Sequence, residues 1–245
     1  SNNIDRFQKF LDMCAIFDET DVLEWAGISG TPAISTSPET APQFKYVVFS
    51  EREKKALDMN VNFFNGYNYT FYAPDNAAMD LAYGMGLPTY EEIHADYDLF
   101  VAMEEEELLA REDELVEAKA RVLNKLNALR AFIRYHFQNN SVFADNLVPQ
   151  ATYQSLYSSD LGIPVNITIQ STDGKLTVTD ESGEKITIHA DDSERLVNKM
   201  TRDYEFDTNR ESAKSIAVSS FAVVHQVSTP LCFNKSKRYD DAWST

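Results

Sequence analysis

The fold of this chain is decided by the stretch YTFYAPDNAAM, residues 69–79. The aromatic and β-branched residues at its start favour a half-buried strand, and Pro74 ends the pairing because it has no N–H to donate. Asp75 is a favourable N-cap, and the alanines that follow are good helix formers. The stretch therefore predicts a strand that turns directly into a capped helix.

Two later stretches belong with the first. LRAFIRYHF at 129–137 predicts a helix that ends in a Tyr-His pair, and FAVVHQVSTPL at 221–231 predicts a closing strand followed by a proline. In this order the three stretches resemble the blocks of the fasciclin family of extracellular adhesion domains. The residues that match the structural motif of the family are Thr70, Phe71, Ala73, Pro74, Asp75, Val223, Val224, His225 and Pro230.

The resemblance implies an α+β fold, a fasciclin-like wedge of mainly antiparallel strands packed with several helices. It also implies a role in adhesion, and in some animal members a pair like Tyr135 and His136 is associated with receptor binding. The chain departs from the family at Tyr72, at Ser220-Phe221 and at Ser228, which replaces an aspartate. The last departure puts in doubt a buried carboxylate network at the C-terminus.

We expect a single domain over residues 1–233. Stretches longer than the family core needs predict elaborations at about 28–66, 88–127 and 191–214. The last of these is polar and is expected to be a surface insertion. Residues 234–245 are predicted to be a polar tail beyond the folded part.

Composition restricts the kind of partner. The 245 residues are 43% hydrophobic and 12% aromatic, which excludes overall disorder. The 39 acidic against 22 basic residues give a formal charge of −17, which repels nucleic acid and anionic lipid. No stretch approaches the roughly 20 apolar residues that span a bilayer, so we expect no direct membrane insertion by this segment.

We expect an extracytoplasmic location, at the cell surface or in the periplasm. The acidic, Tyr-rich and Cys-poor composition fits a bacterial envelope protein, such as an outer-membrane lipoprotein, better than an animal matrix protein. No signal segment stands at the start, so the anchor would lie in a part of a larger chain.

Cofactor and metal sites are not predicted. None of the four histidines has the spacing of a zinc helix or ribbon. Cys14 and Cys232 both have apolar neighbours, so two free thiols are expected, with a bridge between them as the alternative.

Residues 99–137 contain neither Gly nor Pro and carry apolar residues at seven-residue steps. This pattern predicts one long helix or two abutting helices whose apolar stripe docks on the sheet. Glu104–Glu107 is expected to be a solvated face near a helix N-terminus. The residues of the stripe are Val101, Leu108, Leu115, Val122 and Leu129, with Leu109, Val116, Leu123 and Leu126 beside them.

Other elements follow from local signals. Helices are expected near 4–14, near 20–27 with Thr20 or Asp21 as the cap, and after Thr89. Alternation predicts strands at 44–49, a hairpin from 163 to 178 that turns at Asp173-Gly174, a return through 186–189, and closing strands at 216–218 and 221–227.

The candidate site residues also have structural interpretations. Tyr135 and His136 leave a helix about 100° apart, so one is expected to pack and the other to lie near the surface. His136 is expected to bond helix carbonyls or a strand, and His225 to be a satisfied core histidine. Asp75 is better explained as a cap than as a catalytic acid.

We expect the first of three functions, and the other two stay open as alternatives. The first is a binding or adhesion module that recognises protein or glycan through helix faces and loops, without catalysis. The second is a carbohydrate-active enzyme with cleft carboxylates. The third is a spacer domain without a ligand. An exposed apolar patch would favour the first, and two cleft carboxylates with shifted pKa values would favour the second.

Overall fold

The computed structural model describes residues 3–28, 68–206 and 216–243. The strand expected at 44–49 and nearly all of the elaboration at 28–66 lie outside the described residues. The helices are α1 (Gln8–Ala15), α2 (Thr20–Trp25), α4 (Asn76–Gly84), α5 (Tyr90–Val101), α6 (Glu105–Ala110) and α7 (Glu112–Tyr135), with the short 3-10 helices η1 (Asn3–Phe7), η2 (Ile16–Asp18) and η4 (Asp240–Ala242).

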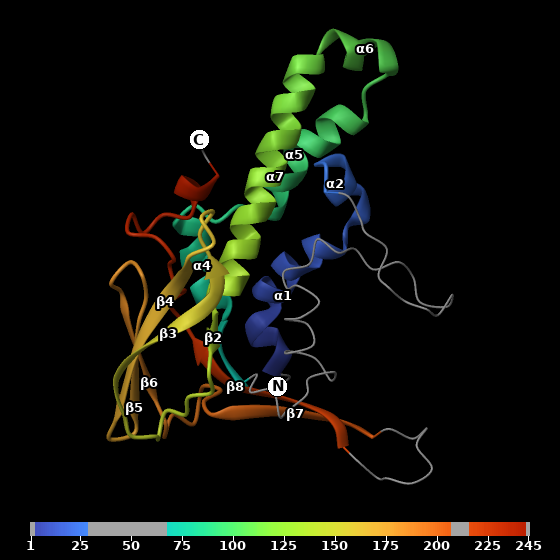
Figure 1. Cartoon of the computed structure of the whole chain (residues 1–245). Helices are drawn as coiled ribbons and strands as arrows, with labels where there is room; N and C mark the ends of the chain where they lie inside the picture. The colour runs from blue at the N-terminus through green and yellow to red at the C-terminus, as the bar shows by residue number, and fades with distance from the viewer. Residues whose placement is uncertain (1–2, 29–67, 207–215, 244–245) are drawn as a thin grey trace.

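The strands form one eight-stranded sheet in the order β6-β5-β4-β3-β2-β1-β8-β7. The sheet curls, so residues of β6 and of the end of β8 line one groove. With the helices gathered toward one end of the sheet, the fold is of the α+β class (Figure 1). The strands are β1 (Asn68–Pro74), β2 (Phe137–Asn139), β3 (Val148–Ser158), β4 (Pro164–Thr172), β5 (Lys175–Thr179), β6 (Lys185–His189), β7 (Lys199–Phe206) and β8 (Ile216–Val227).

Strand β1 joins the three sequence stretches. It pairs in parallel with β8, where Tyr72 lies opposite His225, and antiparallel with β2, where Thr70 lies opposite Gln138. The amide of Tyr72 also donates to the carbonyl of His136, with 2.9 Å between nitrogen and oxygen. The expectation that residues near 70, 135 and 225 meet in one unit is confirmed.

The predicted helix starts are mostly confirmed. Asp75 caps α4 by accepting from the amide of Ala78 at 3.0 Å, and Thr89 caps α5 in a reciprocal capping box with Glu92. The cap expected for α2 is wrong by one residue. That helix already includes Thr20, and Glu19 precedes it without a side-chain bond.

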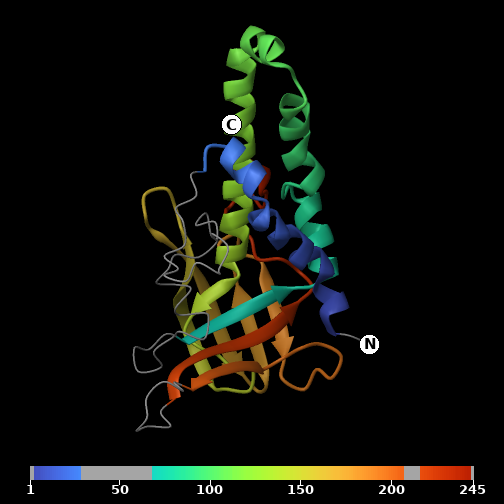
Figure 2. The ribbon, with the colours of Figure 1, turned by 90° about the vertical axis from the view of Figure 1, so that its right-hand side faces the viewer.

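Of the two alternatives expected over 99–137, the single long helix is wrong, and the two abutting helices are present as α6 and α7. The chain breaks after α5 and again at Arg111, and α5 and α7 stand side by side as a helical hairpin with α6 at its far end (Figures 1 and 2). The carboxylates of Glu104–Glu107 do lie at a helix N-terminus, because α6 begins at Glu105. No Gly or Pro marks the break, so only the packing of α5 against α7 decides it.

The predicted hairpin of β4 and β5 and the return through β6 are confirmed, with Asp173 and Gly174 at positive φ in the turn. The surface insertion expected at 191–214 is wrong in part. Residues 199–206 form β7, which pairs antiparallel with β8. The two closing strands are one, β8. A strand at the edge of a sheet tolerates polar residues, which hides it in the sequence.

The C-terminal segment is not a tail outside the fold. Tyr239 is fully buried and donates its hydroxyl to the carbonyl of Leu231 at 2.7 Å. Trp243 donates from its indole to the carbonyl of Gly86 at 2.9 Å. These two aromatic residues anchor a segment whose polar composition suggested otherwise.

The core lies between α7, the N-terminal helices and the sheet. Phe132 and Leu129 of α7 belong to the same buried cluster as Ile167 of β4 and Val178 of β5. Each such side chain stabilises the fold by roughly 1.5–3 kcal/mol. Cys14 and Cys232 are free thiols, and burial raises the pKa of Cys232 to about 11. No helix among the described residues combines the length and apolarity that crossing a bilayer requires.

Candidate binding surfaces

Tyr135 and His136, the pair that the fasciclin resemblance associates with binding, both lie in the core. Neither side chain has accessible surface. The expectation that one would lie near the surface is wrong, because α7 ends here between the sheet on one side and the C-terminal segment on the other. A ligand cannot touch either side chain unless these layers separate.

Each of the two side chains has fixed partners. The hydroxyl of Tyr135 donates to the carbonyl of Asn166 at 2.9 Å and accepts from the amide of Glu181 at 2.7 Å. In His136, Nδ1 lies 2.7 Å from the carbonyl of Phe132, and Nε2 accepts from the amide of Leu231 at 3.0 Å. These partners fix the neutral ring with its proton on Nδ1, and burial lowers the pKa of His136 to about 4.

His225 is a satisfied core histidine, as predicted. Its Nε2 donates to the carbonyl of Val142 at 2.8 Å, and its Nδ1 accepts from the amide of Asn198 at 3.3 Å. Burial lowers the pKa of this imidazole as well. His136 and His225 therefore both act as neutral hydrogen-bonding groups that join segments of the core.

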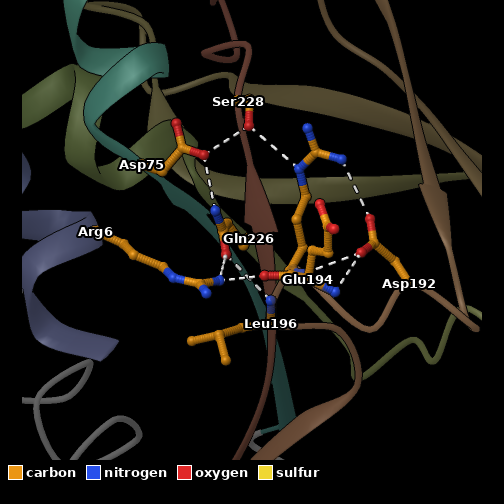
Figure 3. A network of polar contacts seen from close by, with 8 residues as sticks. Arg6, Asp75, Asp192, Glu194, Leu196, Gln226 and Ser228 are labelled. Atoms are coloured by element: carbon orange, nitrogen blue, oxygen red, sulfur yellow. Dashed lines mark hydrogen bonds and ion pairs between the residues drawn. The ribbon is translucent and has the colours of Figure 1, made fainter. Parts of the chain in front are cut away.

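Asp75 stands at the centre of a polar network (Figure 3). One carboxylate oxygen caps α4, and the other accepts from Gln226 Nε2 at 2.8 Å and from Ser228 Oγ at 2.6 Å. A carboxylate network therefore does exist at this end of the sheet. The carboxylate comes from position 75, and Ser228 serves as a donor to it.

The Asp75 network extends to two arginines. Arg195 donates from Nε to Ser228 Oγ at 3.3 Å, and from Nη1 to Asp192 at 3.2 Å. Arg6 donates to the carbonyl of Glu194 and, at 3.5 Å, to Gln226. The network ties η1, the start of α4, the loop before β7 and the end of β8 together. Since each Asp75 oxygen already has a donor, this carboxylate suits a structural role and not proton transfer.

A polar groove of about 650 Å³ lies beside α7, β3 and the C-terminal segment. Its lining includes Asn124, Tyr157, Ser158, Asp160 and Asp241. Amides, carboxylates and an aromatic ring are the groups that bind sugars by hydrogen bonds and stacking, so the groove, with two aspartates in its lining, has the right chemistry for a small polar ligand.

The far end of the helical hairpin is the second surface. We call residues 101–117 the hairpin tip. None of its residues is buried, and the side chains of Leu109 and Val116 are 69% and 62% exposed. Among the residues of the predicted stripe, the first that is fully buried is Val122 of α7. The expectation that the whole stripe docks on the sheet is therefore wrong for its first half.

Contacts in the stem hold the hairpin tip in place. Arg121 forms an ion pair with Asp96 at 2.8 Å, and Lys125 donates to the carbonyl of Glu92 at 2.7 Å, so α7 is fastened to α5 twice. At the tip, the guanidinium of Arg111 lies 5.2 Å from the ring centroid of Phe100. The tip is thus presented by a braced stem.

The tip is also strongly acidic. It contains eight Asp and Glu residues and a single basic residue, Arg111. Sequence reasoning singled out both the stripe and the run Glu104–Glu107 but kept them apart. One signal in the sequence connects the two features. Carboxylates flank the first half of the stripe on both sides, and a segment with so many charges is unsuited to docking on a core.

Among the described residues, no group of three or more His, Cys, Asp or Glu side chains is arranged to hold a metal ion. The sequence matches no known family model, and no curated protein matches it. The fasciclin resemblance therefore rests on the motif residues alone.

Proposed function

We propose that this chain is a non-catalytic binding module that contacts a partner protein through the hairpin tip. The observation that carries the proposal is the exposure of Leu109 and Val116 at the end of a stem that extends beyond the core. Contiguous exposed apolar patches that are rimmed by polar residues are typical of protein interaction sites.

The energetics of the tip support a role in binding. Helix α6 has six residues and no buried side chain, whereas isolated helices shorter than roughly 12–15 residues are marginal in water. The tip therefore adds no fully buried side chain to the core of the domain. If a partner covered this surface, the burial of Leu109 and Val116 would contribute favourable free energy to binding.

We also propose that the domain is fasciclin-like and works outside the cytoplasm, at a cell surface or in the periplasm, attached through another part of a longer protein. The parallel pairing of β1 with β8 supports this, since it brings the motif stretches side by side. The role of Tyr135 and His136 is then to hold the sheet, and the partner is met elsewhere.

An array of immobilised matrix proteins and glycans tests the proposal. The unmodified domain and the double variant Leu109→Ser/Val116→Ser are applied in parallel. Leu147→Ser is the matched control, because Leu147 is exposed in a loop outside the tip. We expect a protein that retains the domain and the Leu147 variant but not the tip variant. Retention of no protein, or equal retention of all three forms, would overturn the proposal.

The polar groove favours a second candidate, glycan binding. Retention on a glycan spot that is lost in Asn124→Ala and kept in the tip variant would assign that function to the groove. Asn124 is suited to the test because its amide can donate to and accept from sugar hydroxyls.

A further inference from the structure

We infer that the partner of the hairpin tip is a basic amphipathic helix of another protein. This inference rests on the proposed function and specifies the chemistry of the partner. It follows from three features of the tip, namely its charge, its exposed apolar side chains and its helical backbone.

The charge selects a basic partner. The tip carries eight acidic residues and one basic residue within 17 positions, and every acidic side chain among them is exposed. At physiological salt such charges act over about 8 Å, which is enough to steer a cationic segment onto the tip and to reject an anionic one.

The apolar residues require more than charge from the partner. Leu109 of α6 and Val116 of α7 expose apolar surface. Lys or Arg side chains alone would leave part of this surface in contact with water. A partner with a leucine-rich face would cover that area while its basic residues meet the surrounding carboxylates. Both requirements together describe an amphipathic segment.

The backbone of the tip selects a helix. The tip consists of α6, the end of α5 and the start of α7, whose amides and carbonyls are mostly used within the helices. It offers no sheet edge to which an extended peptide could add. Helices instead pack through side chains spaced at three and four residues, and this is how amphipathic helices dock on helical surfaces.

The same features disfavour the other occupants. A second copy of this chain would bring an equally acidic tip, and like charges placed face to face cost several kcal/mol. Anionic lipid headgroups and nucleic acid are repelled for the same reason. A basic amphipathic helix is the partner that can both pair with the carboxylates of the tip and cover Leu109.

Synthetic peptides test the inference. The probes are three peptides of about 18 residues, long enough for appreciable helix. The first has a leucine face and a lysine face, the second replaces every Lys by Glu, and the third has the composition of the first in a scrambled order without an apolar face. Binding of each to the purified domain is measured by fluorescence anisotropy at physiological salt.

We expect the first peptide to bind and the other two to bind at least about tenfold more weakly. Two variants locate the site. Leu109→Ser/Val116→Ser and Glu106→Gln/Glu117→Gln should each weaken binding of the first peptide by about threefold to tenfold. The matched controls Leu147→Ser and Asp173→Asn/Asp191→Asn should leave the binding unchanged. Circular dichroism confirms that each variant is folded.

Equal binding of the Lys and Glu peptides, equal binding of the scrambled peptide, or no effect of the tip variants would overturn the inference. The array experiment separates this failure from failure of the proposed function. A protein retained through the tip without a basic amphipathic segment would keep the binding module and exclude this partner. Loss of tip-dependent retention altogether would exclude both.

Discussion

The end of the sheet around Asp75 and the hairpin tip differ in the side chains that they bury and expose. The first buries polar groups, and the second exposes apolar ones. Around Asp75, the carboxylate of Asp75 and the amide of Gln226 are buried, and 2.8 Å separates their bonded oxygen and nitrogen atoms. At the tip, apolar side chains lie in water on a helical stem. The residues with a family resemblance therefore build the fold, while the surface that we propose for a partner lies in an elaboration of it.

The largest change in stability is expected when the carboxylate of Asp75 is removed. Replacing Asp75→Ala removes the cap of α4 and leaves Gln226 and Ser228 without their acceptor. We expect a loss of about 4 kcal/mol in the free energy of unfolding, because hydrogen bonds to a charged group contribute about 1.5–3 kcal/mol each and a cap about 1 kcal/mol. Urea unfolding followed by circular dichroism measures it.

Asp75→Asn is the control, because it keeps the shape and one acceptor oxygen. It should restore about half of the lost stability, since Asn can still cap α4. If the alanine variant loses less than about 1 kcal/mol, the network is a surface feature, and the contrast with the tip disappears.

The buried histidines make the free energy of unfolding depend on pH. The pKa of His136 is lowered to about 4 in the folded protein against 6.5 for the free side chain. Between these values the unfolded chain binds a proton that the folded chain excludes, so the contribution of His136 to stability falls as the pH drops from 7 to 4 and levels off below 4. The loss from His136 alone is about 3 kcal/mol.

Other groups titrate in the same interval, so the measurement compares the protein with His136→Gln. Burial lowers the pKa of His225, which adds to the acid sensitivity, and raises the pKa of Asp180, which opposes it. The difference between the two pH profiles isolates His136. Its ring can also be titrated directly by NMR, and a midpoint near 6.5 would show that the site is open to water.

Local signals predicted the parts of the fold that depend on neighbours in sequence. Pro74 ends β1, Asp75 caps α4, and Asp173-Gly174 turns one hairpin, and each effect is complete within a few residues. The meeting of the three stretches was expected from the fasciclin resemblance and not from these local signals.

The parts that failed depend on distant partners. Tyr239 is buried because its ring packs near Phe132 and Phe233, with centroids at 5.3 and 5.6 Å, and no local pattern reports such a site. The donors to Asp75 come from the parallel register of β1 and β8, in which Ala73 lies opposite Gln226. Helix periodicity similarly showed an apolar stripe without showing where the core beneath it ends.

Two valines of one helix, α7, test where the core beneath the apolar stripe ends. Val116 and Val122 both lie on α7, but Val116 is 62% exposed while Val122 is fully buried. Val122→Ala should cost about 2 kcal/mol, because it leaves a cavity in the core. Val116→Ala removes no packed atoms, and alanine is the better helix former, so the change should lie between zero and about 0.5 kcal/mol of stabilisation. Thermal and urea unfolding of both variants measure the pair, and an equal cost at the two positions would mean that the tip is packed against the protein itself, which would remove the reason to look for a partner there.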